Sequence, residues 1–329
     1  MRRETFTDFD AFRDTNPQVD GEWLINGGTD WRWITESLNV GQCYALRCYL
    51  HTGVITEGVA ADDSYQFYVP FKNKNWRNNG VQFHDDSVLI IEPGVEHCVT
   101  TSTADGWHGF LVPRHLVEVK QGAAGEPVRY SYLVNGKKGH VDVMRDLFDK
   151  VIAELSKNPG IEASPAMRMV ETELRSLLLP LLRPGKDGDP PDGGASNPGR
   201  PRLSRCEILR RSQAVLEEFA SEPVHVSQLA ERVGVSERSL RTVFNEHYQI
   251  GPRRYLLLRQ LHKVHANLLV ADSDAVKVTD VLTRWGVWQF GRFAGLYKAQ
   301  FGELPNETLH RRSLMNSNVA ARVGRTEAR

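Results

Sequence analysis

The chain has 329 residues, of which 40% are hydrophobic and 25% are charged, a composition typical of a soluble globular protein with about two domains. No apolar run approaches the roughly 18 residues that a membrane helix needs, and the first residues lack the apolar stretch of a signal peptide. These observations argue against a secreted or integral membrane protein, and we expect a cytoplasmic one. The cysteines show no metal-clip spacing, so we expect free thiols.

The formal net charge of zero hides an uneven distribution of charge along the chain. Residues 200–329 contain 21 Lys and Arg against 13 Asp and Glu, a net charge of +8, and residues 1–199 carry the balancing charge of −8. Such asymmetry predicts a basic module that contacts a polyanion and an acidic module with a separate role.

Residues 20–120 consist of short stretches rich in aromatic and β-branched residues, separated by turn signals such as Pro93-Gly94. Several short strands at this spacing predict a small barrel or a sandwich. The predicted strands cover residues 41–50, 65–71, 87–91 and 107–112.

Two amphipathic helices are predicted after the strands. In the first, apolar residues recur at spacings of three and four between Met144 and Leu155. The second has Ser164 as its N-cap and Pro165 at its first position, and Pro180 kinks or ends it. The sequence leaves two roles open for this pair: covering the open side of the barrel, or pairing with the same helices of a second subunit in a homodimer.

The clearest boundary in the chain is the segment 183–202. Half of its residues are Pro or Gly and none is a large apolar residue, so it cannot bury enough surface to offset the entropy of ordering it. We predict an N-terminal domain at 1–182, a flexible linker at 183–204, a second domain at 205–312 and a disordered tail at 313–329.

The basic half contains a degenerate internal repeat of about 52 residues, and each copy predicts a helix, a glycine turn and a second helix. Two copies joined by a helical run from Tyr255 to Val270 favour DNA binding over a plain helical bundle. The matching pairs at an offset of 52 are Val226 and Val278, Leu229 and Val281, Gly234 and Gly286, and Val235 and Val287; those at 53 are Leu240 and Phe293, Phe244 and Tyr297, Tyr248 and Phe301, and Pro252 and Pro305.

In the first copy, Ser227 is predicted to cap a short helix that Gly234 ends with a positive φ. Ser236 is predicted to cap the next helix, whose solvent side is where a recognition helix presents side chains to a major groove. The predicted buried residues of this helix are Leu240, Val243, Phe244 and His247, and the predicted base-reading residues are Arg238, Ser239, Arg241 and Thr242.

In the second copy, Gln289, Gly291 and Arg292 are predicted to face outward near the start of the second helix. Arg and Gln side chains can make bidentate contacts to guanine and adenine. Lys298, Arg253 and Arg254 are better candidates for phosphate contacts, which position a protein without reading sequence. The expected partner is therefore double-stranded promoter DNA.

These residues carry a resemblance to a known family. Residues 205–312 resemble the DNA-binding domain of the AraC/XylS transcription regulators, which implies two helix-turn-helix units joined by a long helix, and RNA polymerase as a further partner. The run Trp285-Gly286-Val287-Trp288 is most similar to the subgroup that contains the ethanolamine-operon regulator. The resemblance implies base-reading positions at Arg238, Arg241 and Thr242 in the first unit and at Gly291, Arg292 and Gly295 in the second. Glycine at both 291 and 295 leaves little for base reading by the second helix, so its role could be mainly phosphate anchoring.

The sequence departs from the family pattern at three positions. Gln249 stands where a turn glycine is usual, which predicts a strained or rebuilt loop. Gln260 replaces a usual Arg in the linker helix, and Leu282 replaces a small Ala, which should alter packing in the second unit.

The N-terminal half is loosely similar to the cupin-like effector-binding barrels of these regulators, on Pro93-Gly94-Val95-Glu96-His97 and Trp107-His108-Gly109-Phe110. A cupin metal enzyme needs about three His and a carboxylate at one ion. His84, His97 and His108 are scattered, so we expect no metal, cofactor or catalytic site, and an enzyme is the alternative hypothesis.

An effector pocket in such a barrel would be apolar with a few polar groups. The candidates from the strands are Arg47, Tyr49, Phe67, Tyr68 and Trp76, each of which could equally be core because the strand phase is open. A second set of candidates, for an anionic effector such as a nucleotide, is Arg200, Arg202 and Arg205, which could also simply be solvated or lie near DNA.

The sequence thus predicts a multidomain α+β protein: an N-terminal cupin-like β-barrel with two following helices and a C-terminal all-α domain of two helix-turn-helix units. The function expected of this arrangement is that of a transcription regulator, an activator by the family resemblance, which binds promoter DNA in response to a small molecule. The alternative is a cupin-like enzyme or a protein-interaction module whose helical bundle does not read DNA.

Overall fold

The computed structural model describes residues 1–16, 19–71, 75–117, 131–135, 139–157, 165–182 and 203–311. The chain forms two compact units, Met1–Ser196 and Asn197–Arg329, and the boundary between them falls inside the predicted linker at 183–204. Most of that linker and the predicted tail at 313–329 lie outside the described residues. Within the described part of the chain, no helix is both long and apolar enough to span a membrane.

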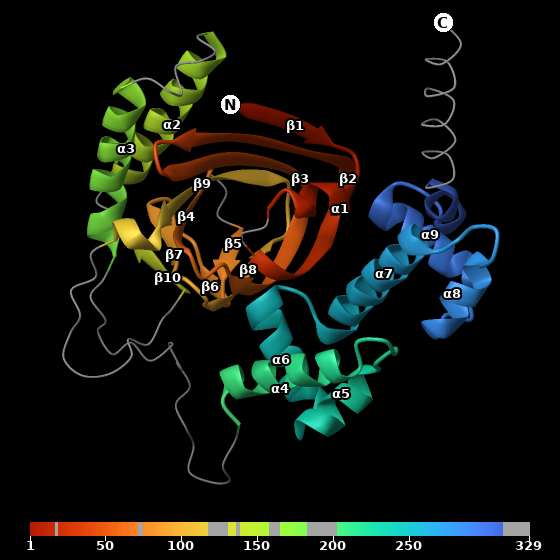
Figure 1. Ribbon diagram of the computed structural model, residues 1–329. Helices are drawn as coiled ribbons and strands as arrows, with labels where there is room; N and C mark the ends of the chain where they lie inside the picture. Colours follow the sequence, from red (N-terminus) through yellow and green to blue (C-terminus); the bar gives the residue numbers. More distant parts are fainter. Residues whose placement is uncertain are drawn as a thin grey trace, which may run out of the picture. The chain divides into compact units, whose positions relative to one another are not determined.

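The N-terminal unit is built on one ten-stranded antiparallel sheet, drawn in red to yellow in Figure 1. Its strand order is β10-β7-β4-β9-β3-β8-β5-β6, with β2 and then β1 added along the other edge of β3. The strands are β1 Arg2–Phe6, β2 Val19–Val40, β3 Cys43–Ala60, β4 Ser64–Pro70, β5 Trp76–Asn78, β6 Val81–Gln82, β7 Ser87–Ile91, β8 Glu96–Thr101, β9 Asp105–Pro113 and β10 Ser131–Asn135.

The sheet curls into a nearly closed barrel because one long strand serves two neighbours. The first part of β3, Tyr44–Leu50, pairs with β9, and its second part, Val54–Val59, pairs with β8. The two ends of the strand order meet at Ser131 of β10, whose Oγ accepts hydrogen bonds from Nδ2 of Asn78 at 3.2 Å and of Asn79 at 2.9 Å. The predicted barrel is confirmed.

Two strands are much longer than the short strands that the sequence predicts. β2 has 22 residues and β3 has 18. In β2, Gly27 and Gly28 adopt φ angles of 88° and 120°, and the register with β3 shifts on either side of Gly28. The two glycines at this bulge are a turn signal in the sequence, whereas in the structure the strand continues through them.

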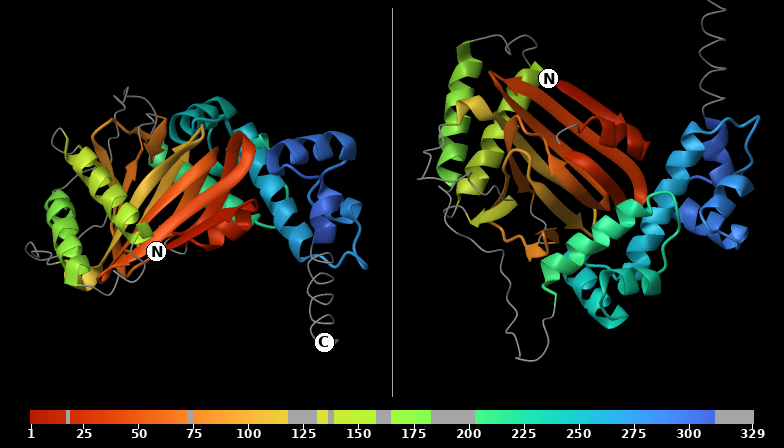
Figure 2. Two further views of the ribbon diagram at one scale, coloured as in Figure 1. Left: turned by 90° about the horizontal axis from the view of Figure 1, so that it is seen from above. Right: turned by 60° about the horizontal axis from the view of Figure 1, so that its bottom comes forward.

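Two helices, α2 (His140–Lys157) and α3 (Pro165–Leu178), lie side by side against the barrel, as Figures 1 and 2 show. Their apolar stripes, including Met144, Phe148 and Leu174, pack with strand residues such as Phe67 and Val88 in one core cluster. The pair therefore covers the sheet, which is one of the two roles left open by the sequence; the homodimer stays a prediction. As predicted, α3 ends before Pro180, in a short 3₁₀ turn at Leu179–Leu181, while Ser164 lies outside the described residues.

The C-terminal unit is helical, with two helix-turn-helix units joined by one long helix. The first comprises α5 and α6, the second α8 and α9, and α7 connects them (Figure 1). The helices are α4 Arg205–Glu218, α5 Val226–Val233, α6 Glu237–Tyr248, α7 Pro252–Val270, α8 Val278–Arg284 and α9 Phe290–Phe301. The predicted fold class is confirmed in both halves.

Candidate nucleic-acid interface and barrel cavity

The first helix-turn-helix unit forms because each end of its helices is capped. Gly234 ends α5 with a φ of 81°, and Ser236 caps α6 by accepting a 3.1 Å hydrogen bond from the backbone N–H of Ser239. The predicted cap of α5 is wrong by two residues: His225 is the N-cap, and its backbone N–H donates to Gln228 Oε1 at 2.9 Å. A side chain at the third helical position thus replaces the serine hydroxyl that the sequence offered.

Helix α6 buries one face and exposes the other. Its buried residues are Leu240, Val243, Phe244 and Tyr248, so the predicted inward residue His247 is only partly buried and its neighbour Tyr248 fills the core instead. All four predicted base-reading residues, Arg238, Ser239, Arg241 and Thr242, are exposed. The Thr242 hydroxyl donates to the backbone oxygen of Arg238 at 3.1 Å, and Ser239 Oγ lies 2.9 Å from Ser236 Oγ.

The arginines of α6 differ from those of α4 in their partners. On α4, Arg210 and Arg211 both form ion pairs with Glu207. Among the described residues, Arg238 and Arg241 have no ion-pair or hydrogen-bond partner for their guanidinium groups. Their charge is therefore available to an external anion. The same holds within the described chain for the other predicted cations, Arg253, Arg254, Arg292 and Lys298, which are all exposed.

The second unit repeats this arrangement with different chemistry on its exposed face. Gly286 forms the turn after α8 with a φ of 69°, and Phe293 and Tyr297 point into the core. Gln289, Gly291, Arg292 and Gly295 are exposed, as predicted. The two glycines at the centre of this face have open space where a Cβ would be placed.

Equivalent aromatic pairs fix both second helices. Phe244 and Tyr248 of α6 have ring centroids 5.1 Å apart, and their repeat partners Tyr297 and Phe301 of α9 have centroids 4.7 Å apart. Because residues i and i+4 lie on one helix face, the two rings of each pair pack together on the buried side of their helix. This geometry supports the internal repeat that the sequence predicts.

Hydrogen bonds of the buried tyrosine hydroxyls connect these aromatic side chains to neighbouring helices. In the first unit, Gln213 of α4 donates hydrogen bonds to the hydroxyls of Tyr248 at 2.5 Å and Tyr255 at 3.2 Å. In the second unit, Tyr297 Oη lies 2.6 Å from Nδ1 of His265 and 2.9 Å from Oγ1 of Thr308.

Helix α7 and the α4–α5 loop hold the second helix-turn-helix unit to the first. Gln260 of α7 donates a 2.6 Å hydrogen bond to the backbone oxygen of Trp285, which gives a role to a residue that departs from the family pattern. Pro223 packs on Gly286: a Cβ added there would lie 2.9 Å from Pro223 Cγ. A groove of about 530 Å³ lies within the C-terminal unit, between its two helix-turn-helix units, and is lined by residues of α4, the α4–α5 loop, α7, the α8–α9 turn and α9.

Gln249 and Leu282 are the remaining departures from the family pattern. Gln249 ends α6 in the left-handed conformation, with a φ of 60°, which costs energy for a residue with a Cβ. Leu282 is buried in the core of the second unit beside Val281 and Trp285. The strained turn at Gln249 agrees with expectation, and the altered packing at Leu282 stays a prediction.

The N-terminal barrel contains a cavity of about 50 Å³. Its lining combines apolar and aromatic side chains with the neutral polar groups of Asn16, Thr56 and His97. None of the lining residues, all of them in the described part of the barrel, is Asp, Glu, Lys or Arg. The lining is Asn16, Val19, Trp23, Val54, Thr56, Tyr68, Pro70, Trp76, Phe83, Leu89, Ile91, His97, Val99 and Trp107.

Two polar groups of this lining are buried without a partner. Trp23 is 7% exposed and Trp107 is 6% exposed. Their indole N–H groups are therefore shielded from water, and they have no hydrogen-bond acceptor among the described residues. The third indole, Trp76, donates to Asp105 Oδ2 at 2.6 Å. Burial lowers the pKa of His97 to about 4, so its imidazole is neutral at physiological pH.

The predicted effector residues fall on both faces of the sheet. Tyr68 and Trp76 line the cavity. Phe67, one residue before Tyr68, faces the opposite side and packs with α2 and α3, because successive residues of a strand alternate between faces. The Tyr68 hydroxyl donates to Gln66 Oε1 at 2.8 Å.

Arg47 and Tyr49 also lie outside the cavity. Arg47 forms ion pairs with Glu36 of β2 and Asp149 of α2, and its guanidinium carbon lies 5.4 Å from the ring centre of Tyr49. Burial, together with the charges of Arg47 and Arg145, lowers the pKa of His108 to about 3. This cluster joins the sheet to α2.

The remaining candidates are separated as well. Arg205 belongs to the C-terminal unit and its Nε lies 3.1 Å from Glu246 Oε2, while Arg200 and Arg202 lie outside the described residues. Of the three histidines considered for a metal site, His97 lines the cavity, His108 faces α2 and His84 is exposed. These three do not converge on one point.

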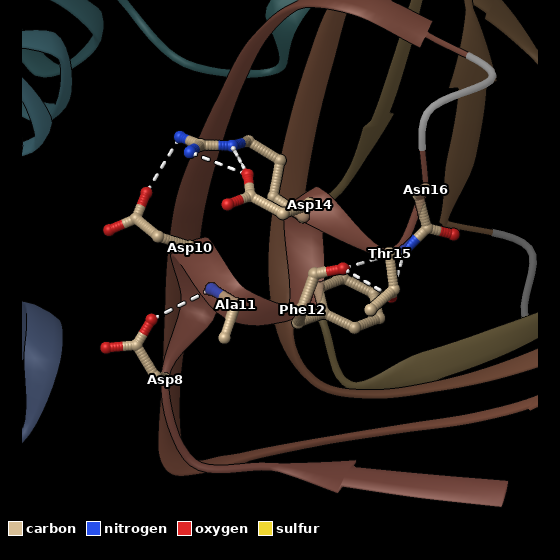
Figure 3. A network of polar contacts seen from close by, with 8 residues as sticks. Asp8, Asp10, Ala11, Phe12, Asp14, Thr15 and Asn16 are labelled. Atoms are coloured by element: carbon tan, nitrogen blue, oxygen red, sulfur yellow. Dashed lines mark hydrogen bonds and ion pairs between the residues drawn. The ribbon is translucent and has the colours of Figure 1, made fainter.

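The cavity residue Asn16 is held in place by a short helix that the sequence did not predict, α1 (Phe9–Asp14), shown in Figure 3. Asp8 caps it by accepting from Ala11 N at 2.9 Å, and Asn16 Nδ2 donates to Phe12 O at 2.9 Å. Phe12 stacks on Trp33 of β2 at a centroid distance of 6.2 Å. The cap signal Asp8 was present in the sequence, but a helix of six residues carries too little periodicity to be recognised.

Comparison with known proteins bears on the helical unit. Residues 229–311 match the family model described as a helix-turn-helix domain. The chain carries a helix-turn-helix domain. The probable thc operon regulatory protein of Rhodococcus erythropolis is 41% identical over 109 residues, which is 33% of this chain and 33% of that protein. The XylDLEGF operon transcriptional activator 3 of Pseudomonas putida is 33% identical over 121 residues, 36% of this chain and 37% of that protein.

The chain therefore spans about a third of the length of these two curated relatives. Among solved structures, the AraC-like transcriptional activator CuxR is 12% identical, with a TM-score of 0.39 over 81% of this chain and 96% of that one. ToxT from Vibrio cholerae is 10% identical, with a TM-score of 0.27 over 82% of this chain and 97% of its own. The resemblance to the ethanolamine-operon regulator subgroup stays a prediction.

Proposed function

We propose that the protein is a transcription regulator of the AraC/XylS type, acting as an activator, which binds promoter DNA through α6 and α9 and responds to a small molecule in its barrel. The observation that carries this proposal is the set of exposed cations on the second helices and on the start of α7, which have no partner among the described residues, whereas the arginines of α4 are paired with Glu207 or Glu246. Cations without internal partners can neutralise phosphates and contact bases at no cost in broken ion pairs.

The two units divide the work of binding. Arg238 and Arg241 of α6 are the strongest candidates for base contacts, because arginine reads guanine through two parallel hydrogen bonds. Lys298, Arg253 and Arg254 are candidates for phosphate contacts. Both relatives named above are described as an operon regulator or an operon activator, and this supports the proposal for the domain that the chain shares with them. That the whole chain acts as a regulator is part of the proposal. RNA polymerase is the partner through which an activator would act.

Selection from a random-sequence DNA library by the full chain, at two salt concentrations, tests this proposal. We expect a defined sequence to be enriched, and its affinity to fall steeply with salt as counterions are released from the neutralised phosphates. Enrichment of no sequence at either salt concentration would contradict it, and the protein-interaction alternative would then take its place.

We further propose that the effector is small and uncharged. The cavity lining of the barrel has no charged side chain among the described residues, and the unpartnered indole N–H groups of Trp23 and Trp107 are donors that need an acceptor. Burying an unpaired carboxylate in such a lining would be costly. A carbonyl or hydroxyl oxygen would accept a hydrogen bond from an indole N–H without that cost.

Acetamide and acetate form a matched pair of probes for this proposal. In a ¹⁵N spectrum of the full chain, acetamide should move two of the seven tryptophan indole signals, and these should be the ones that disappear in Trp23→Phe and Trp107→Phe. Acetate at the same concentration should leave them unmoved. A stronger response to acetate, or movement of other indoles only, would contradict an uncharged effector at this cavity.

A further inference from the structure

The turn between α8 and α9 exposes an aromatic side chain that packing does not explain. Trp288 is 75% exposed, and Phe290 at the start of α9 is 37% exposed. The neighbours Trp285 and Val287 are buried in the core of the second unit, so the fold is complete without Trp288. Trp288 also lines the groove described above together with Leu256 and Leu296, and a contiguous apolar surface of this kind marks a contact site for a partner.

The charge around Trp288 identifies the kind of partner. From Val281 to Gly302 the sequence contains no Asp or Glu, and it contains three cations, Arg284, Arg292 and Lys298, all of which are exposed. The groove that Trp288 lines contains one acidic residue, Glu222, against the four cations Arg253, Arg259, Lys263 and Arg292. A surface that combines an exposed indole with a net positive charge is complementary to a polyanion. An acidic rim would be needed to complement a basic partner, and this segment has none.

The position of Trp288 matches a groove-reading role. It directly precedes Gln289, the N-cap of α9, and the N-terminal end of a recognition helix is the part that meets base edges. The adjacent face of α9 carries glycine at 291 and 295, with open space beyond each. A helix face without side chains allows the backbone to approach the floor of a groove closely.

From this arrangement, and resting on the DNA-binding function proposed above, we infer that Trp288 is a specificity-determining residue that contacts the 5-methyl group of a thymine in the major groove. The second unit then reads DNA chiefly by an apolar contact, while the first unit reads it by arginine. Thymine is the base that offers an apolar group in the major groove, so an indole discriminates it from cytosine and from the other bases.

Single replacement of each operator thymine by deoxyuridine removes only the 5-methyl group and tests this inference. Using the sequence selected by the full chain, we expect at least one replacement to weaken binding about fourfold, the equivalent of one buried methylene at about 0.8 kcal/mol. Trp288→Ala should bind more weakly and lose its sensitivity to that replacement, whereas Trp288→Phe should keep part of it. Val270→Ala, which removes another apolar side chain that is 72% exposed, is the matched control and should behave as wild type.

A second variant approaches the same surface from the helix. Gly291→Leu should raise thermal stability, because glycine is a poor helix former and the site is open, and yet weaken operator binding by holding α9 away from the groove. Unchanged affinity and unchanged deoxyuridine sensitivity in Trp288→Ala would overturn the inference, and binding of a protein partner would then explain the exposed indole. If Arg241→Ala still weakens binding in that case, the proposed function survives; if the wild type selects no DNA, both fall.

Discussion

The two turn glycines of the repeat provide a matched pair of perturbations. Gly234 and Gly286 occupy equivalent positions and have φ angles of 81° and 69°. A Cβ at Gly234 meets nothing within 4 Å, whereas one at Gly286 would lie 2.9 Å from Pro223 Cγ. Replacement of each glycine by alanine therefore adds the same backbone strain, and only the second replacement adds a collision.

The magnitudes follow from these two terms. A left-handed conformation costs a residue with a Cβ about 1–2 kcal/mol, and alanine recovers roughly 0.4–1 kcal/mol by restricting the unfolded chain. Gly234→Ala should thus lower the free energy of unfolding by about 1 kcal/mol. Gly286→Ala should lower it by a further 1–3 kcal/mol, the usual cost of overpacking, and should shift the second unit relative to the first.

Hydrogen exchange of the full chain, read by mass spectrometry on peptides from α6 and α9, measures each unit separately. We expect Gly286→Ala to accelerate exchange in α9 far more than Gly234→Ala accelerates it in α6, and to weaken operator binding disproportionately. Equal effects of the two substitutions, within about 0.5 kcal/mol, would refute the role assigned to the contact between Pro223 and Gly286.

Three further predictions concern single residues. Arg241→Ala should weaken specific DNA binding by about 1–3 kcal/mol, whereas the control Arg210→Ala, whose side chain pairs with Glu207, should leave it unchanged; equal effects in a titration would contradict the assignment. Lys298→Ala should weaken binding to all sequences alike and lower the salt slope by about one, and a loss confined to the operator would speak against a phosphate contact. The folded-state pKa of His97 is about 4, below its unfolded value of about 6.5, so its contribution is present above pH 6.5 and is lost as the pH falls toward 4. The free energy of unfolding in urea should fall with falling pH by up to about 1.4 kcal/mol per pH unit for this histidine. His97→Gln should remove that contribution while the one due to His108 remains; an unchanged pH dependence in the variant would show that it does not come from His97.

The sequence predicted the helical unit more closely than the barrel because its signals there are local. Ser236, Gly234 and the aromatic spacing of α6 determine helix ends and faces through neighbours along the chain, and strand β7 was likewise placed at residues 87–91 by its own apolar run. The phase of β4 depends on which side α2 and α3 cover. The sequence alone therefore could not show which of Phe67 and Tyr68 faces the cavity, and only Tyr68 lines it.

Three other cavity residues were missed as effector candidates for a related reason. Trp23, His97 and Trp107 lie on three different strands and come together only through the strand pairing of β2, β3, β8 and β9. Nothing in the local pattern distinguishes an indole that lacks a hydrogen-bond partner from one that has one. Exposure of Trp288 was equally hidden, since its aromatic neighbours Trp285 and Phe293 are buried.

The central claim, that both helix-turn-helix units read one DNA duplex, is tested most directly by hydroxyl-radical footprinting of the full chain on its selected operator. We expect two protected segments on one face of the duplex, about one helical turn or 34 Å apart. Arg241→Ala should weaken protection of one segment first and Trp288→Ala that of the other. A single protected segment, or protection lost equally across the site in both variants, would contradict the account.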